Sequence, residues 1–382
     1  MCHPWHPDSQ DFPDQCTHQP EPDSERCNTI LYTTVVHRGS TKRLPTCKFL
    51  YNDMKSWLAN MLSQTDIEVH ADRGVFAGCW SADVELADIW DGKVFQEFKG
   101  PDGKPFIQPG SQEGQYIFSL CMDGFNPFIM KEAGKKVSVC SIYMVLLNLP
   151  VDVHYHVKNM YLVSIIPGPW EPSLEQINHF LGPLVDDLLH FWEPGVFIRH
   201  TPHYPRGHLC CAPLTPVVCD LPAARQIMGS ASHSSTNFCS LCKLPLQQID
   251  NLDTKSWQLR TLKDHLQSAH AWKNVVSTSE QSKLFHNNGI RWSELLCLPY
   301  WDPTAFVVLN CMLLLLLGNL QRHCREVWGM NFHLEDDDFC VKPNSKSCTT
   351  EEQLHYGNSV LTNGTAREVG ALLAKVIIVF FR

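Results

Sequence analysis

The sequence feature that most constrains this chain is a short apolar run that ends in a carboxylate. Residues 116–122 (YIFSLCM) have a strongly strand-forming pattern, and Asp123 and Gly124 follow them directly. An isolated carboxylate at the end of a buried strand is costly unless it is paired or binds a metal ion. Two interpretations are open, because Asp-Gly is also a common turn that simply ends a strand.

Three further elements follow this first strand. Residues 137–149 and 160–166 predict two more strands, and their short separations are typical of antiparallel neighbours. Ser173 then precedes an apolar stripe at helical spacing that continues to Trp192, which predicts a helix capped by Ser173.

A second aspartate ends the next predicted strand. Residues 208–219 form this fourth strand, Asp220 follows it, and a helix begins directly after Asp220. Three antiparallel strands, a crossover helix and a fourth strand are the order of an RNase H-like domain, in which the first and fourth strand ends lie side by side. Asp123 and Asp220 would then converge and hold Mg²⁺ or Mn²⁺ through their oxygens.

The predicted fold class is α/β, with an RNase H-like mixed sheet as the core. A mainly helical insertion that contains Cys and His interrupts this core, and C-terminal helices complete it. The expected organisation is a disordered or truncated N-terminal remnant (1–45), an N-terminal helix with an irregular region (46–114), the core strands (115–232), the Cys/His insertion (233–290) and a helical, shortened C-terminal part (291–382).

Composition excludes several protein classes. The 382 residues are 44% hydrophobic and 19% charged, as in a globular protein. The net charge of −9 gives no whole-chain attraction to nucleic acid, so DNA binding needs a local basic patch such as residues 198–208. The first residues lack a secretory signal, so the 17 cysteines are expected to be reduced thiols. The apolar runs 305–320 and 370–381 are too short to span a membrane and are expected to be buried helices.

The insertion contains a possible zinc site. Cys239 and Cys242 have C-x2-C spacing, and His265 and His270 follow as a second pair. These are the ligand types of a structural Zn²⁺ site, although the 22 residues between the two pairs exceed the spacing in compact fingers. Accidental pairs are common in a chain this rich in Cys and His, so zinc binding and chance remain alternatives.

Several long segments together resemble a known family. They are MDGFNPF, NMYLVSIIPGPWEPSLEQINHFLGPLVDDLLHFWEPGV, PRGHLCCAPLTPVVCDLPAARQIMGSASHSSTNFCSLCK and RWSELLCLPYWDPTAFVV. In this order they closely resemble the transposases of CACTA (En/Spm-like) DNA transposons, and in particular the fungal Plavaka-type branch. The resemblance is strongest from residue 115 to residue 330.

The resemblance implies a DDE/D triad that binds two Mg²⁺ ions and cuts and joins DNA ends. Asp123 and Asp220 match the first two acids, whereas Asn310 stands at the expected third position. A neutral amide balances the metal charge less well than a carboxylate, so metal affinity and water activation should fall. Glu294, Asp302 and Glu326 are candidate substitutes that the sequence does not distinguish.

The leading hypothesis is therefore a cut-and-paste DNA transposase with impaired catalysis, acting in the nucleus. The alternative is a catalytically dead DNA- or protein-binding derivative. The expected partners are transposon-end and target DNA and further copies of the chain, with no membrane.

Overall fold

A computed structural model describes residues 14–73, 88–127, 138–310 and 312–327, apart from short gaps at 20, 22, 38, 47–48, 109, 169–170 and 174. The chain divides into two compact units. The first comprises Met1–Gly78 and Lys93–Leu309, and the second comprises Cys79–Gly92 and Asn310–Arg382.

Ten strands occur in the described residues, and all of them belong to the first unit. They are β1 (Tyr32–His37), β2 (Ser40–Pro45), β3 (Gly114–Gln115), β4 (Phe118–Phe125), β5 (Val139–Leu146), β6 (Met160–Ile166), β7 (Val196–Ile198), β8 (His208–Cys211), β9 (Leu214–Cys219) and β10 (Val307–Leu309).

The helices vary from single turns to the 16 residues of α5. The α-helices are α1 (Met54–Leu62), α2 (Thr65–Arg73), α3 (Lys93–Gln96), α4 (Val151–His154), α5 (Ile177–Trp192), α6 (Leu221–Met228), α7 (Leu262–Lys273), α8 (Thr278–Asn288) and α9 (Pro303–Phe306). Short 3-10 turns are η1 (Ile89–Asp91), η3 (Val157–Asn159), η4 (Leu246–Gln248), η5 (Thr254–Ser256) and η6 (Glu294–Cys297), and π-helical segments are η7 (Met312–Leu320) and η8 (His323–Val327).

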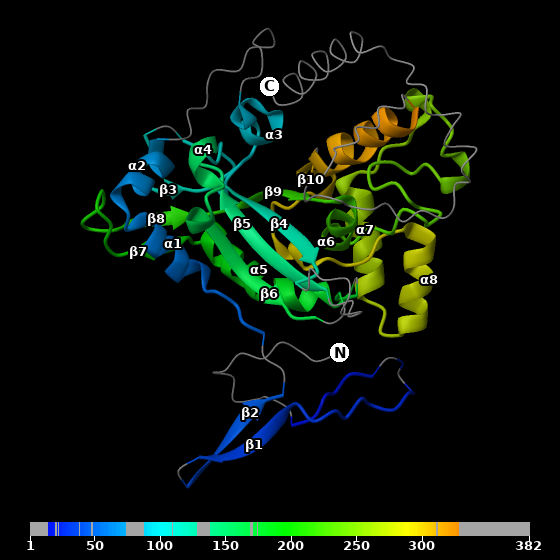
Figure 1. Ribbon diagram of the computed structural model, residues 1–382, viewed down its shortest axis with the longest axis horizontal. Coiled ribbons are helices and arrows are strands. Elements are labelled where there is room, and N and C mark those ends of the chain that lie inside the picture. Colours follow the sequence, from blue (N-terminus) through cyan, green and yellow to red (C-terminus); the bar gives the residue numbers. More distant parts are fainter. Residues whose placement is uncertain are drawn as a thin grey trace, which may run out of the picture. The chain divides into compact units, whose positions relative to one another are not determined.

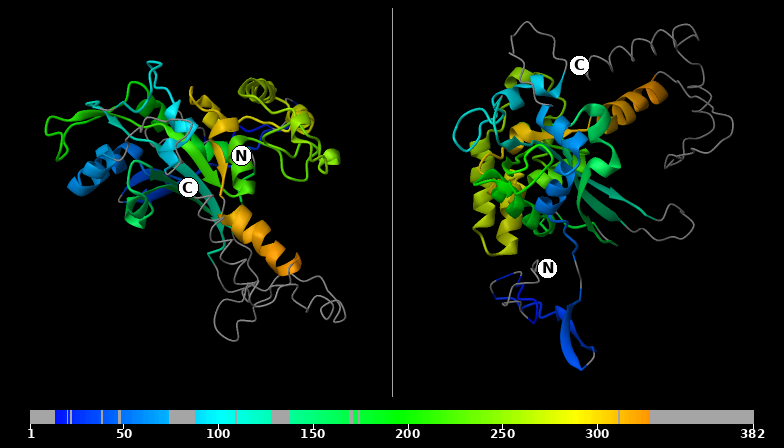
Figure 2. Two further views of the ribbon diagram at one scale, coloured as in Figure 1. Left: turned by 90° about the horizontal axis from the view of Figure 1, so that it is seen from above. Right: turned by 90° about the vertical axis from the view of Figure 1, so that its left-hand side faces the viewer.

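The core of the first unit is a five-stranded mixed sheet in the order β10-β9-β4-β5-β6 (Figures 1 and 2). β4, β5 and β6 are antiparallel neighbours, whereas β9 lies parallel to both β4 and β10. The predicted mixed α/β class is confirmed. α5 precedes β9 in the chain, and this long crossover lets β9 return parallel to β4.

One face of the sheet carries the hydrophobic core. Leu120, Met122, Ile142 and Val217 are fully buried or nearly so on that face. α1 and α6 contact strands of the sheet, and α5 contacts both helices, so the three helices form one layer. Successive side chains of a strand point to opposite faces of the sheet, and those on the opposite face are more exposed to solvent. Asp123 lies among these open positions.

A buried carboxylate connects α5 to the start of α1. Asp187 of α5 accepts a hydrogen bond from the Tyr51 hydroxyl at 2.6 Å and another from the Met54 backbone N–H at 3.2 Å. Lys55 Nζ lies 3.5 Å from the same carboxylate. Asp187 therefore anchors the first turn of α1, where backbone N–H groups have no partner within the helix.

Several predicted elements differ from the observed ones. β6 has the predicted bounds, but the helix predicted from Ser173 begins only at Ile177. The single strand predicted at 208–219 is wrong: Pro213, which has no N–H, separates β8 from β9, and the two belong to different sheets. The apolar run at 305–320 contains β10, so the prediction of one buried helix there is also wrong.

Two parts of the N-terminal half carry structure that was not predicted. β1 and β2 form an antiparallel hairpin inside the stretch expected to be disordered or truncated. The predicted N-terminal helix corresponds to α1, and a second helix, α2, follows it. The apolar run 370–381 lies outside the described residues.

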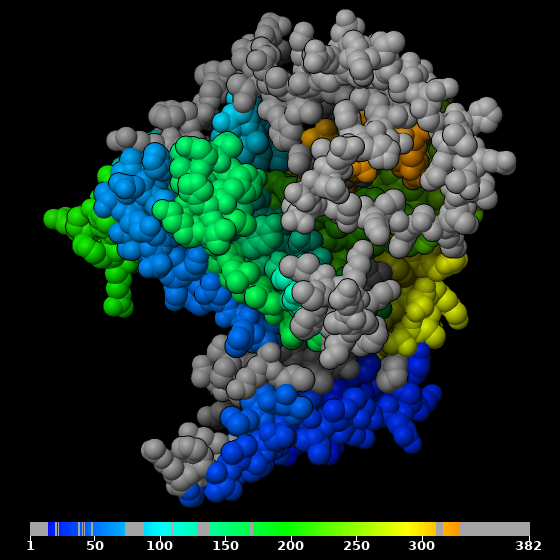
Figure 3. All heavy atoms as spheres, viewed as in Figure 1, coloured from blue at the N-terminus to red at the C-terminus, as the bar shows by residue number. Residues whose placement is uncertain are grey.

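The surface between β5 and β6 exposes apolar side chains. Val151, Tyr155 and Val157 are all more than half exposed, and the α4 segment lies on the face shown in Figure 3. A search of the described helices for one that is both long and apolar enough to cross a bilayer finds none.

Replacement of Asp187 tests this anchoring role. We expect Asp187→Ala to lower the free energy of unfolding by about 2–4 kcal/mol, because a buried hydroxyl, a backbone N–H and a lysine all lose their acceptor. The neighbouring exposed residue provides a matched control, since Asp186→Ala should change stability by less than about 0.5 kcal/mol. Urea unfolding of both variants measures the difference, and equal losses would contradict the assignment.

Candidate active site

The two predicted aspartates lie on neighbouring parallel strands. Leu120 of β4 pairs with Val217 of β9, and Asp123 and Asp220 are each three residues further along their strands. Asp123 is still inside β4, which extends to Phe125, so it is not a residue of a terminal turn. Its side chain is exposed and that of Asp220 is half-buried. The turn interpretation of Asp123 is therefore wrong.

The charges of both aspartates affect the pKa values of two nearby cysteine thiols. Burial is the main cause that raises the pKa of Cys140 to about 12, and the negative charges of Glu171, Asp123 and Asp220 raise it further. The charges of Asp123 and Asp220 also act on Cys121. Two thiols on two strands thus lie within electrostatic range of both aspartates, which agrees with the strand register.

Asp220 has a structural role as well as a candidate chemical one. It is the N-cap of α6, and its Oδ1 accepts a hydrogen bond from the Ala223 N–H at 2.8 Å. A carboxylate can accept several hydrogen bonds through its two oxygens, so capping still leaves acceptor capacity.

α6 ends at a glycine that no other residue can replace without a steric clash. Gly229 has a φ of 77° and closes the helix in the left-handed conformation. A Cβ at this position would lie 2.5 Å from the Arg291 carbonyl oxygen, so only glycine fits.

A pair of neighbouring thiols, on β4 and β9, was not predicted. The Cys219 thiol donates a hydrogen bond to Cys121, and this bond is the main cause that lowers the pKa of Cys121. The sulfur of Cys219 in turn accepts the Met122 N–H at 3.2 Å. In the sequence, Cys121 lies two residues before Asp123, and Cys219 lies directly before Asp220. This proximity was the available signal, but without the strand register it does not show that the two cysteines are in contact.

Glu171 is a third carboxylate near the same strand end. Its Oε1 accepts a hydrogen bond from the Ser138 hydroxyl at 2.9 Å. The same atom lies 3.4 Å from where a Cβ on Gly124 would be. No sequence pattern pointed to Glu171, because it lies in the loop after β6.

The expected third-acid position follows the last strand of the sheet. Asn310 comes directly after β10 and is the first residue of the C-terminal segment of the second unit. Leu309, the residue before it, pairs with Cys219, the residue before Asp220.

The three candidate substitutes for the third acid all have local partners. Glu294 accepts a hydrogen bond from the Trp292 indole N–H at 3.1 Å. Asp302 caps α9 through the Thr304 N–H at 2.8 Å. Glu326 pairs with Arg322 at 2.8 Å. Across the described part of the chain, no three His, Cys, Asp or Glu side chains are grouped closely enough to hold a metal ion by themselves.

The four predicted zinc ligands are not gathered into one cluster. Cys239 and Cys242 lie together in a tight turn, where the Cys242 N–H donates to Cys239 Sγ at 3.3 Å. His265 is buried in α7. His270 is exposed on another face of the same helix, and its ring lies 5.1 Å from that of Trp292.

The basic segment 198–208 connects β7 to β8 in a small sheet of order β3-β8-β7. Arg199, His200 and Arg206 are exposed, but His208 is buried and stacks on Tyr204 with 4.0 Å between the rings. This segment precedes β9 and Asp220 follows it, so the two lie at opposite ends of a strand about 20 Å long. The exposed cations therefore cannot contact the same phosphate as the aspartates.

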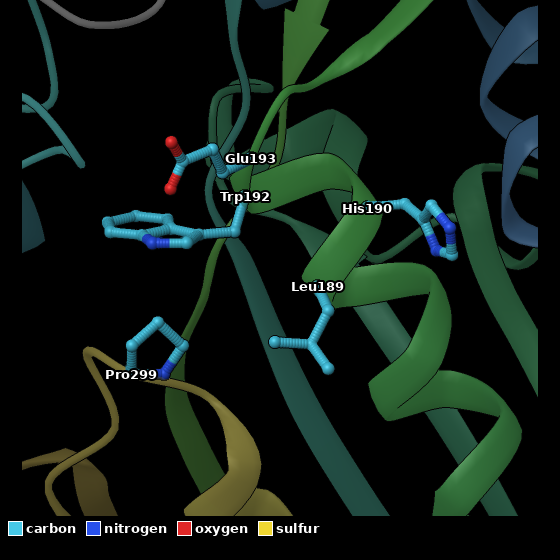
Figure 4. A pocket seen from close by; sticks show the side chains of 5 residues that line it. All are labelled: Leu189, His190, Trp192, Glu193 and Pro299. Atoms are coloured by element: carbon cyan, nitrogen blue, oxygen red, sulfur yellow. The ribbon is translucent and has the colours of Figure 1, made fainter.

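A shallow hollow of about 270 Å³ lies elsewhere in this unit, at the end of α5 (Figure 4). Figure 4 shows the Trp192 ring between Glu193 and Pro299, while His190 points away from it. None of the predicted site residues lines this hollow.

The burial of His265 has a measurable consequence. Burial, aided by the charge of Arg260, lowers the pKa of His265 from its usual 6.5 to about 4. The unfolded chain therefore binds a proton more tightly, and stability should be lost as the pH falls from about 6.5 toward 4, by about 2–3 kcal/mol. We expect His265→Gln to flatten this part of the pH profile of unfolding and the exposed His270→Gln to preserve it. Identical profiles for the two variants would contradict the burial of His265.

Comparison with known proteins gives this arrangement a family context. Residues 109–285 match a family model described as "Transposase family tnp2". The match includes β4, β9, Asp123, Asp220 and both insertion cysteines, but not β10 or Asn310. A sequence search of curated proteins found no match. The region from residue 109 to residue 285 is therefore similar to this transposase family.

Proposed function

We propose that this chain is the transposase of a cut-and-paste DNA transposon of the CACTA type, with weakened catalysis. The observation that carries the proposal is the position of Asp123 and Asp220 at the ends of two adjacent parallel strands, inside a transposase-family domain. An RNase H-like core is supported by the three antiparallel strands, the helical crossover and the parallel fourth strand. Its partner would be DNA, and its site of action the nucleus.

The donor atoms of the two aspartates fit a hard divalent cation. Mg²⁺ is commonly held by one or two carboxylates while water and substrate phosphates complete its octahedron. Two aspartates on an open strand end therefore suffice to hold one ion without a closed protein cage.

Each residue has a distinct role in this proposal. Asp123 would hold the cation from β4, and Asp220 would hold it from β9 while its Oδ1 keeps the first turn of α6 in place. When bound, Mg²⁺ supplies a Lewis acid that lowers the pKa of water and stabilises the leaving oxygen of a phosphodiester. Exposure of Asp123 allows a DNA backbone to approach the pair.

Weakened catalysis follows from Asn310. An amide oxygen is a neutral ligand and leaves the charge of the cation less compensated than a carboxylate does. The same substitution supports a second candidate function, a catalytically dead derivative that binds DNA or protein without cutting. The exposed Arg199 and Arg206 would serve DNA binding in either case.

Cation binding can be measured without any catalysis. We expect millimolar Mg²⁺ or Mn²⁺ to raise the melting temperature of the protein, because a ligand of the folded state stabilises it. Asp123→Asn and Asp220→Asn should each abolish this shift, and Asn is a good N-cap, so α6 should remain intact in the second variant. Asp186→Asn is the matched control on an exposed site. A shift that survives in both aspartate variants would place the cation elsewhere.

Nicking of transposon-end DNA separates the two candidate functions. We expect slow Mg²⁺-dependent nicking by the natural chain and faster nicking by Asn310→Asp. Adding Asp123→Asn or Asp220→Asn to Asn310→Asp should reduce the rate at least about 100-fold, since even outer-shell changes around a metal cost up to that much. DNA affinity, measured in parallel, should stay unchanged. If both the natural chain and Asn310→Asp bind DNA but neither cuts it, the binding derivative is the correct function.

A further inference from the structure

Two cysteines on neighbouring strands have no part in the proposed chemistry. Cys121 lies in β4, and Cys219 is the last residue of β9. Counted from the Leu120–Val217 pair, the two cysteines are one residue out of register. Neighbouring strands lie about 4.8 Å apart and rise about 3.3 Å per residue, so the two Cα atoms are about 6 Å apart. This separation falls within the range of about 4.4–6.8 Å that disulfides span.

The sulfur of Cys219 lies between the two strands. It accepts the backbone N–H of Met122, the residue after Cys121, at 3.2 Å. Side chains one residue out of register ordinarily point to opposite faces of a sheet, but a sulfur held between the strands can be reached from either face. The hydrogen bond from the Cys219 thiol to Cys121 agrees with this position. The two thiols are therefore in contact.

The two thiols differ in their access to solvent. Cys121 is partly exposed, whereas only 1% of Cys219 is exposed. Tyr143 of β5 pairs with Cys121, and its hydroxyl donates a hydrogen bond to the Cys121 sulfur. A dissolved oxidant therefore reaches Cys121 first, and Cys219 is placed to react with the product. An accessible cysteine beside a second, resolving cysteine is a common arrangement in redox sensors.

A third thiol, on β5, is too far away to compete. Cys140 pairs with Gly124, which lies three residues beyond Cys121 on β4. Three residues of a strand span about 10 Å, which exceeds the Cα separation of about 7 Å that a disulfide tolerates without backbone movement. Cys219 is therefore the better placed partner for Cys121.

We propose that Cys121 and Cys219 are a redox-active pair that hydrogen peroxide converts into a reversible disulfide. The Cys121 thiolate attacks one peroxide oxygen, so an S–O bond forms, the O–O bond breaks, and hydroxide leaves and takes up the thiol proton as water. The Cys219 sulfur then attacks the Cys121 sulfur, and the hydroxyl group leaves with the Cys219 proton as a second water. The two sulfurs are oxidised by two electrons in total, and the peroxide is reduced by two. An added dithiol restores both thiols by exchange.

The disulfide also acts on the candidate cation site, and this effect rests on the proposed function. Met122 directly precedes Asp123, and Cys219 directly precedes Asp220. Bonding to Cys121 draws the Cys219 sulfur away from the Met122 N–H, which shifts the backbone beside both carboxylates. Changes of this kind around metal ligands lower affinity by about 10- to 100-fold, so the oxidised protein binds the cation more weakly.

Peptide mapping of the full chain tests the thiol pair without any metal. The reduced protein is treated with hydrogen peroxide, the remaining thiols are alkylated, and the digest is analysed by mass spectrometry before and after reduction. We expect a linked Cys121–Cys219 peptide that disappears on reduction. Cys219→Ser should leave a sulfenic acid on Cys121 that dimedone traps, and Cys140→Ser, the matched control, should form the same disulfide. Absence of the linked peptide, or a link from Cys121 to another thiol, would overturn the proposal.

The Mg²⁺-induced rise in melting temperature separates this proposal from the proposed function. The reduced protein should show the rise, and the oxidised protein should need at least about 10-fold more Mg²⁺ for the same rise. Cys121→Ser, treated with peroxide in the same way, should behave as the reduced protein does. Equal rises in the reduced and oxidised protein would overturn the effect on the cation site. No rise even in the reduced protein would overturn the proposed Mg²⁺ site, while the linked peptide would still establish the redox pair.

Discussion

The parallel pairing of β4 with β9 is the constraint on which the candidate active site depends. The two strands are almost a hundred residues apart in the chain, and only the α5 crossover allows them to run in the same direction side by side. A strand shifted by one residue turns every side chain to the opposite face. The Leu120–Val217 pair therefore places Asp123 and Asp220 equally far along two neighbouring chain segments, and another register would change this.

The strand order could be predicted from sequence, but its details could not. The apolar runs and the stripe of α5 are strong periodic patterns, so the three antiparallel strands and the crossover helix were recognisable. β10 was not, because Val307–Leu309 lies inside a longer apolar run that has no strand period of its own. α2 was missed for the opposite reason, since few of its residues are apolar and its buried residues are Ile67, Glu68 and Ala71.

For the candidate sites, too, some features could be predicted from the sequence and others could not. Two strongly patterned strands, each with an aspartate near its end, were enough to predict that the strands carrying Asp123 and Asp220 are neighbours, which the pairing of β4 with β9 confirms. The zinc prediction used spacing alone, and spacing does not show which face of α7 a histidine occupies. Burial of His265 and exposure of His270 are properties of tertiary packing, so only the structure shows them. Glu171 and the Cys121–Cys219 contact likewise depend on register and loop position.

The ligand chemistry of the aspartate pair suits a hard cation. Asp123 is exposed and Asp220 is half-buried, and both offer oxygen ligands near the end of the sheet, where a phosphate can complete the coordination of the ion.

Anomalous diffraction from crystals of the full chain grown with Mn²⁺ tests the central claim most directly. Our account requires a manganese peak at the end of β4 and β9, within about 2.2 Å of an oxygen of Asp123 and of an oxygen of Asp220. An ordered strand end with the two carboxylates on opposite faces, or with manganese bound only elsewhere, would contradict it.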